Sequence, residues 1–164
     1  MIQLIILDVD GTLTNGQIIY GNDGNETKSF NVKDGLGIAA WIKLGKKVAI
    51  ITGRQSKIVE NRARELNITY IKQGISNKAE ALKEILEESQ ISLNEVAVIG
   101  DELNDLSMFK MVHYSFAPED SAKEIKKHAK KVLKNKGGEG AVREMIDYLI
   151  KKEKLQAKLY EIFL

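Results

Sequence analysis

The chain of 164 residues contains no cysteine, which excludes several kinds of chemistry. Without thiols it can form no disulfide bond, thiolate nucleophile or cysteine-based zinc site. A long hydrophobic run is also missing, because the N-terminal MIQLIILDVDG is too short to span a bilayer. This segment lacks the basic start and the small-residue cleavage site of a secretion signal as well. We therefore expect a cytoplasmic protein with no membrane partner.

The sequence has little excess charge of either sign. Its 25 Lys and Arg residues against 23 Asp and Glu residues give a net charge of +2, and Lys and Glu are interleaved in the C-terminal half. The Lys-rich stretch 123–136 has apolar residues at roughly helical spacing, which favours a solvated helix face over a nucleic-acid-binding patch. We expect no nucleic-acid partner.

Short apolar runs alternate with helical patterns along most of the chain. The runs predicted as strands are 3–9, 47–53, 68–72 and 95–101, and the predicted helices are 35–45, 56–67, 78–90 and 102–112. Strands that are apolar on both faces and alternate with helices are typical of a parallel sheet covered on both sides. The predicted fold class is therefore α/β, with a Rossmann-like parallel sheet flanked by helices in a single domain over residues 1–164.

Two segments depart from this alternation. Residues 18–32 contain two alternating stretches around the turn-rich GNDGNE, which predicts a β-hairpin that projects from the core. Residues 137–164 are predicted to form a C-terminal tail, with a flexible glycine hinge followed by a helix.

Acidic residues lie where predicted strands end. Asp8 and Asp10 are two residues apart, so their side chains share one face while Val9 points back into the core. Two carboxylates so close repel each other unless a cation lies between them or one is protonated. Alone, this pair is as compatible with a turn as with a site. Asp101, at the end of another strand, adds a third oxygen donor, and such a set suits Mg²⁺.

The residues near these strand ends also suit phosphoryl transfer. Asp8 can act as a nucleophile, since carboxylates form aspartyl-phosphate intermediates. Lys78 and the Thr52 hydroxyl can hold phosphate oxygens, and the amides around Gly11 can donate where a side chain would block the phosphate. Asp10 would protonate the leaving oxygen and later accept a proton from water.

Four segments resemble, in order, the motifs of the haloacid dehalogenase-like phosphatases: DVDGTLT, ITGR, Lys78 and GDELND. The resemblance covers residues 5–105 and implies a role for each motif residue. It implies a nucleophile at Asp8, a general acid/base at Asp10 whose carbonyl also binds Mg²⁺, phosphate ligands at Thr52 and Lys78, a metal ligand at Asp101, and an outer-shell partner of the metal at Asp105. The segments between the motifs leave no room for a cap domain.

Longer stretches resemble the 3-deoxy-D-manno-octulosonate 8-phosphate phosphatases, namely 31–38, 48–68 and 137–149. In that family a hairpin builds a homotetramer and the tail lies over an adjacent active site. The resemblance implies hydrolysis of this sugar-acid phosphate for lipopolysaccharide synthesis. The substrate contacts that it implies are Asp10, Asn31, Val32, Lys33, Asp34, Gly35, Arg54, Arg62 and Lys78. Ala39 departs from the pattern, since a basic residue is often expected there.

Three alternatives stay open. The substrate could be another sugar-acid phosphate, such as a nonulosonate 9-phosphate. The chain could also be a phosphatase-like oligomerisation module related to those of sialic-acid cytidylyltransferases, although such a module need not keep the complete set of motif residues. A signalling receiver fits poorly, because its acceptor aspartate is expected on a middle strand and here the paired aspartates follow the first strand.

Overall fold

The computed structural model describes all 164 residues, and the predicted apolar runs form β1, β4, β5 and β6, four neighbouring strands of its six-stranded main sheet. The strands of this sheet are β1 (Leu4–Leu7), β4 (Lys47–Ile51), β5 (Tyr70–Lys72), β6 (Val96–Ile99), β7 (Tyr114–Ala117) and β8 (Lys131–Val132). All pairs are parallel, and the order is β5-β4-β1-β6-β7-β8. The carboxyl ends of the strands therefore meet at one edge of the sheet.

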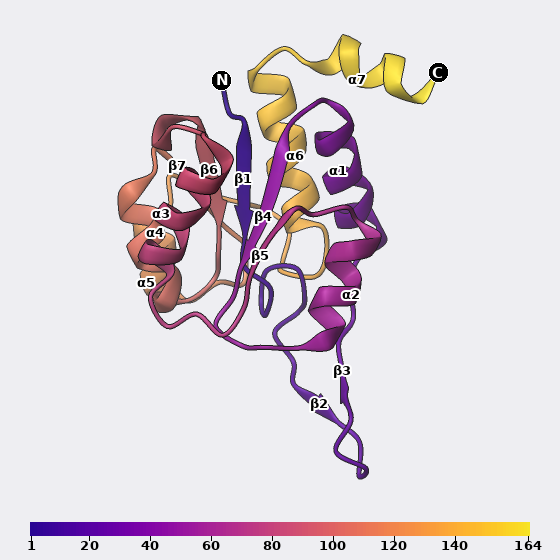
Figure 1. Cartoon of the computed structure of the whole chain (residues 1–164), viewed down its shortest axis with the longest axis vertical. Helices are drawn as coiled ribbons and strands as arrows, with labels where there is room; N and C mark the ends of the chain where they lie inside the picture. The colour runs from indigo at the N-terminus through magenta and orange to yellow at the C-terminus, as the bar shows by residue number, and fades with distance from the viewer.

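Helices cover both faces of the sheet (Figure 1). They are α1 (Val32–Lys43), α2 (Lys57–Glu65), α3 (Lys78–Ser89), α4 (Leu106–Met111), α5 (Lys123–His128), α6 (Ala141–Lys152) and α7 (Gln156–Phe163), with 3-10 turns η1 (Leu93–Glu95) and η2 (Leu103–Asp105). Alternation along β1 divides the core, since Ile5 and Leu7 face α1, α2 and α6 while Leu4 and Ile6 face α3, α4 and α5. The predicted fold class is confirmed, and only secondary-structure elements of the core and the hairpin lie between the motifs.

The strands β7 and β8 are not predicted by the sequence pattern. β7 begins with a partly exposed tyrosine and includes a serine, and β8 pairs through only two residues. Neither has the long apolar run that marks a buried strand.

The first helix begins at Val32, three residues before the predicted start. The Asn31 side chain caps this helix by accepting a hydrogen bond from the Lys33 amide at 2.8 Å.

The predicted hairpin is present as β2 (Ile19–Tyr20) and β3 (Glu26–Thr27), which pair antiparallel. It projects beyond the edge of the sheet where the strands end, while α7 lies at the opposite end of the molecule (Figure 1). Only two residues of each strand pair, and Ile18, Ile19 and Tyr20 are exposed. The hairpin is therefore held to the body by its root and not by the main sheet.

The C-terminal segment differs from the expected flexible hinge and tail. Gly137 and Gly138 pack tightly on the loop after β1, where the Gly138 amide donates to the Thr12 carbonyl at 3.0 Å. A Cβ at Gly137 would lie 1.8 Å from the Gly11 carbonyl oxygen. These glycines permit close approach of two backbones, and α6 beyond them is part of the core.

None of the helices is both long and apolar enough to span a membrane.

Candidate functional site

Three of the predicted catalytic residues, Asp8, Asp10 and Thr52, meet in one hollow at the carboxyl ends of β1, β4 and β6. The hollow has a volume of about 250 Å³ and is lined by no hydrophobic residue, its lining being Asp8, Asp10, Gly16, Thr52, Gly53, Arg54, Asp101, Glu102 and Asn104. Val9, between the two aspartates, is fully buried in the core. The alternation read from the sequence therefore places both carboxylates on the hollow, as predicted.

Lys78 lies directly behind this hollow, although it opens α3 far along the chain. Its ammonium group contacts Asp8 Oδ1 at 2.7 Å and Asp105 Oδ1 at 2.6 Å, and its side chain is completely buried. Asp105 also accepts hydrogen bonds through Oδ2 from the amides of Asp101 and Glu102, at 3.0 and 3.2 Å. Asp105 thus fixes both the lysine and the loop that carries Asp101.

Asp101 approaches the loop after β1 very closely. Thr12 Oγ1 donates a hydrogen bond to Asp101 Oδ1 at 3.1 Å. Gly11 has a φ of +90°, and a Cβ there would lie 2.0 Å from Asp101 Oδ2. From the sequence alone, Gly11 is expected to make room for a phosphate group, whereas the structure shows that the carboxylate of Asp101 needs this space.

The charges in this cluster are not balanced. Burial and the nearby charge of Asp105 raise the pKa of Asp8 well above its usual range. The same two causes raise the pKa of Asp101 to about 6. Burial alone would lower the pKa of Lys78, but the charges of Asp8 and Asp105 outweigh it and raise this pKa. Three carboxylates therefore share a single ammonium group.

These carboxylates could hold a metal ion. Oxygens of Asp8, Asp101 and Asp105 all lie within 4.8 Å of one another. Oxygen donors without histidine or cysteine suit a hard dication such as Mg²⁺, whose charge would relieve the mutual repulsion that raises the pKa values. Because Lys78 and two amides already occupy both oxygens of Asp105, Asp8 and Asp101 are the side chains best placed as ligands.

Arg54 connects the catalytic hollow to the hairpin. Its Nη2 atom donates to Tyr20 Oη at 3.1 Å and to Glu26 Oε1 at 3.2 Å. The Arg54 side chain is still 45% exposed, so its guanidinium group can contact a ligand in the hollow. The predicted sugar contact at Arg54 is therefore also an anchor for the base of the hairpin.

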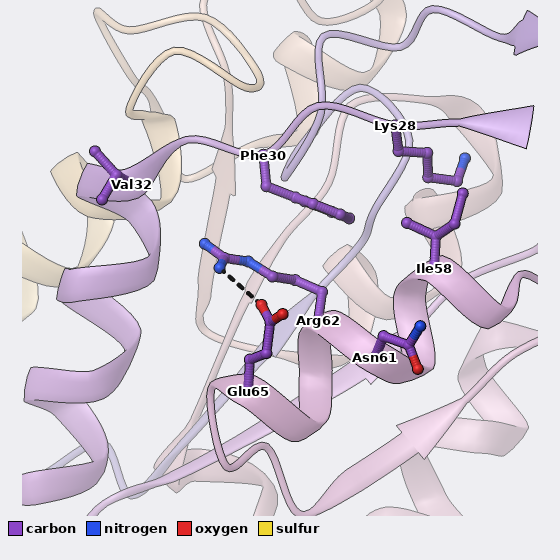
Figure 2. Close-up of a pocket in the computed structure, with 7 residues that line it drawn as sticks. All are labelled: Lys28, Phe30, Val32, Ile58, Asn61, Arg62 and Glu65. Carbon is purple, nitrogen blue, oxygen red and sulfur yellow. Dashed lines mark hydrogen bonds and ion pairs between the residues drawn. The ribbon is translucent and has the colours of Figure 1, made fainter.

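Arg62 lies in a second hollow, which has a volume of about 390 Å³ and shares no lining residue with the first (Figure 2). The other residues around it are Lys28, Phe30, Val32, Ile58, Asn61 and Glu65. Arg62 stacks over the Phe30 ring at 5.5 Å and pairs with Glu65 at 3.3 Å. Within one chain, the structure thus separates Arg62 from the cluster around Asp8.

The predicted sugar-binding segment 31–35 is divided between surface and core. Val32 and Lys33 are exposed at the start of α1, beside the hollow of Arg62. Asp34 is buried and accepts a hydrogen bond from the Arg143 amide at 2.8 Å, which caps α6. A Cβ at Gly35 would lie 2.5 Å from Arg62 Nη2, so this glycine makes room for the guanidinium group. Ala39, one turn further along α1, is partly buried.

Lys28 is a polar residue near the site that the sequence does not single out. It comes from the hairpin, and its Nζ contacts Asp10 Oδ1 at 2.5 Å. No motif marks this lysine, because one lysine in an alternating hairpin reads as an exposed side chain. Only the position of the hairpin root reveals that it points to Asp10.

Comparisons with known proteins show which proteins the chain is similar to. A family model described as haloacid dehalogenase-like hydrolase matches residues 70–146. The 3-deoxy-D-manno-octulosonate 8-phosphate phosphatase of Escherichia coli K12 is 45% identical over 149 residues, which cover 91% of this chain and 79% of that protein. The corresponding protein of Yersinia pestis is 44% identical, with 91% and 80% covered.

Solved structures show the same fold. The crystal structure of a 3-deoxy-D-manno-octulosonate 8-phosphate phosphatase from Moraxella catarrhalis, in complex with magnesium, phosphate and a KDO molecule, matches with a TM-score of 0.95 and 37% identity. The match covers 99% of this chain and 94% of that one. The cobalt-bound deoxy-D-mannose-octulosonate 8-phosphate phosphatase from Haemophilus influenzae gives a TM-score of 0.88 at 37% identity, with 92% and 88% covered.

Proposed function

The chain belongs to the haloacid dehalogenase-like phosphatases and, within them, to the 3-deoxy-D-manno-octulosonate 8-phosphate phosphatase family, and from this membership we propose its reaction. The enzyme hydrolyses 3-deoxy-D-manno-octulosonate 8-phosphate to the free sugar acid and phosphate, and it requires Mg²⁺. The observation that carries this proposal is the contact of Asp8 with the buried Lys78, where Asp8 lies beside Asp10 and Asp101 in a hollow lined by no hydrophobic residue.

Asp8 is the nucleophile in this proposal. One of its carboxylate oxygens bonds to phosphorus while the bond between phosphorus and the sugar oxygen breaks. Asp10 gives a proton to the departing oxygen, and the sugar acid leaves. Water then attacks the phosphorus of the aspartyl phosphate and gives its proton to Asp10. Inorganic phosphate leaves, and Asp8 returns to its starting state.

Three further groups support these steps. The ammonium group of Lys78 has three hydrogens, of which two reach Asp8 and Asp105, and the third is available to a phosphate oxygen. The Thr52 hydroxyl lines the same hollow and supplies another donor. Asp8, Asp101 and the Asp10 carbonyl would hold Mg²⁺, which would supply positive charge to neutralise the phosphate oxygens.

The guanidinium groups explain why a sugar acid suits this enzyme. The substrate carries a carboxylate in addition to its phosphate, and arginine forks bind both kinds of anion. Arg54 offers such a fork in the catalytic hollow, and Arg62 offers another in the adjacent one beside Val32 and Lys33. A nonulosonate 9-phosphate carries the same two anions and is the second candidate substrate.

Association into a homotetramer in the cytoplasm completes the proposal. The catalytic hollow is open to water, so selectivity for a small sugar acid needs walls from a neighbouring chain. The exposed apolar residues of the hairpin are suited to contact such a neighbour, since a two-stranded hairpin alone is marginally stable. A purely structural oligomerisation module is the less favoured reading, because it has no use for the assembled set of Asp8, Asp10, Lys78 and Asp101.

A phosphate-release assay with a panel of sugar phosphates tests the proposal. We expect Mg²⁺-dependent turnover, fastest with the octulosonate ester. Asp8→Asn should abolish it, whereas the control Glu87→Gln, which changes an exposed carboxylate on α3, should leave it intact. Faster hydrolysis of a nonulosonate 9-phosphate would make that ester the proposed substrate in place of the octulosonate ester. Full activity of Asp8→Asn, or no turnover of any phosphomonoester by the unchanged protein, would refute the enzymatic proposal.

A further inference from the structure

Lys28 extends from the hairpin into the body of the protein and ends at the proposed general acid/base. It follows β3 directly, and Figure 2 shows its side chain reaching past Ile58. Its Nζ contacts Asp10 Oδ1 at 2.5 Å and Glu26 Oε1 at 3.2 Å. Only 1% of the side chain is exposed, although the hairpin around it is largely in water.

This orientation needs an explanation. Lysine side chains are almost never fully buried unless they are paired, and a lysine on a projecting hairpin could easily turn its ammonium group to solvent. Lys28 instead places its charge between two carboxylates. Of these, Asp10 belongs to the catalytic hollow and Glu26 to the hairpin itself.

The contacts of Lys28 continue into a chain of polar contacts. Glu26 forms an ion pair with Lys28 and accepts a hydrogen bond from Arg54, and Arg54 also donates to Tyr20 on the opposite strand of the hairpin. The root of the hairpin is thus fastened to the catalytic hollow at two points, through Arg54 and through Lys28. Of these, only Lys28 touches a residue with a chemical role in the proposed reaction.

We propose that Lys28 is a positioning residue, which holds the carboxyl group of Asp10 in the orientation for proton transfer to and from the substrate. This role rests on the proposed function. Lys28 bonds to Oδ1, and no hydrogen bond from the protein reaches Oδ2, so Oδ2 is the oxygen left free to carry the proton. That proton passes to the sugar oxygen as its bond to phosphorus breaks, and the attacking water later restores it.

The leaving group of the substrate provides the test. A sugar alkoxide is strongly basic and needs a proton as it departs, whereas the p-nitrophenolate of p-nitrophenyl phosphate departs without one. We expect Lys28→Met to lower both kcat and kcat/KM for the octulosonate ester by about 100-fold, the lower end of general acid–base contributions. With p-nitrophenyl phosphate, kcat/KM, which covers the steps up to departure of the leaving group, should fall roughly threefold or less, because proton donation contributes little to those steps. The later attack of water, in which Asp10 accepts a proton, affects only kcat. Lys28→Arg should restore most of kcat, and the control Lys57→Met, at an exposed position on α2, should behave like the unchanged protein.

A double-mutant cycle gives a second, independent readout. In an Asp10→Asn background, Lys28→Met should cause no further loss with the octulosonate ester, since the group that it positions is already disabled. Equal losses on both substrates, additive losses in the cycle, or a rise in KM with unchanged kcat would each overturn the role.

The outcomes separate the two proposals. If the unchanged protein hydrolyses a different sugar phosphate faster, the comparison is made with that ester, and only the substrate assignment fails. If it hydrolyses no phosphomonoester, both proposals fail. If Lys28→Met does not fold, Lys28→Gln takes its place in the same comparison, with p-nitrophenyl phosphate turnover reporting an intact nucleophile.

Discussion

At the scale of single residues, the site depends on buried charges that are satisfied by one another. Lys78 has no contact with water and relies on Asp8 and Asp105, while both carboxylates rely on Lys78. In such a group the loss of one member leaves the others buried without a partner, which is more costly than the original interaction was favourable. Stability and catalysis are therefore linked in these three residues.

Lys78→Met should lower the free energy of unfolding and abolish phosphate release. Leaving two buried carboxylates without their cation costs roughly 3–5 kcal/mol in the free energy of unfolding. The matched control is Lys72→Met, because Lys72 also pairs with two carboxylates, Glu84 and Glu88, but at the surface. That change should cost about 1 kcal/mol or less. Urea denaturation of both variants measures the difference, and equal costs would contradict the argument.

Without Mg²⁺, the stability of the protein should fall as the pH rises through the range from about 4 to about 6. Burial and the charge of Asp105 raise the pKa of Asp101 to about 6 from the usual 3.8, and the pKa of Asp8 is raised as well. In this range Asp8 and Asp101 bind more protons in the folded state than in the unfolded state, so their contribution to the free energy of unfolding decreases as the pH rises. Above about pH 6 the contribution of Asp101 has been lost.

Mg²⁺ should therefore raise the Tm more at pH 7 than at pH 5, because it takes the place of the bound protons. At a concentration 100-fold above its Kd, the ion would add about 2.7 kcal/mol to stability. Thermal unfolding in EDTA and in Mg²⁺ at both pH values measures this, and Asp101→Asn should flatten the dependence. A Tm shift of the same size at both pH values would argue against carboxylate ligation.

At the scale of elements, the loops after the strands are determined by contacts between distant segments. The loop after β1 packs against Asp101 from the loop after β6 and against Gly137 from the segment before α6. From the sequence alone, Gly11 is expected to make room for a phosphate group and the C-terminal glycines to form a flexible hinge. Their true neighbours come from elsewhere in the chain, and no local pattern could identify them. β7 and β8 were missed because their short runs carry little apolar signal.

Gly11→Ala should disrupt the site far more than a comparable change in the hairpin. Gly11 and Gly24 share a similar backbone, with φ of +90° and +81°, but a Cβ at Gly11 would overlap Asp101, whereas one at Gly24 would meet nothing within 4 Å. Gly24→Ala should therefore cost only the backbone strain of about 1–2 kcal/mol. Gly11→Ala should add the displacement of Asp101.

The measurement that distinguishes the two variants is the Mg²⁺-dependent rise in Tm. We expect Gly24→Ala to keep this rise in full and Gly11→Ala to lose most of it, together with phosphate release. The close approach of Asp101 would have no functional meaning if Gly11→Ala kept both its Tm rise and its activity.

At the scale of the whole molecule, the two ends have different characters. The carboxyl ends of the strands, the catalytic hollow and the projecting hairpin lie at one end, and α7 lies at the other (Figure 1). The α7 helix therefore does not cover the active site of its own chain. The exposed apolar residues Ile18, Ile19 and Tyr20 on the hairpin are left in water unless another chain covers them.

Light scattering should show a particle of four 18.4-kDa chains, and Ile19→Lys should reduce its mass. Ile19 is 44% exposed on β2, so a charge there is tolerated in a single chain but not in an apolar interface. We expect kcat/KM for the octulosonate ester to fall about tenfold, since neighbouring walls are lost. Val132→Lys, on a similarly exposed valine of β8, is the control. A fully active monomer of the unchanged protein would refute assembly as a requirement.

The amino-acid sequence is sufficient to predict the parallel α/β fold, the order of the motifs and the face shared by Asp8 and Asp10. These features depend on periodicity and on strand ends, which are local properties of the chain. The contact of Lys28 with Asp10, the pairing of Asp105 with Lys78 and the position of Asp101 at Gly11 are seen only in the folded structure. Those contacts depend on how distant segments pack, because a buried charge is stabilised by whichever partner the fold brings within hydrogen-bonding distance.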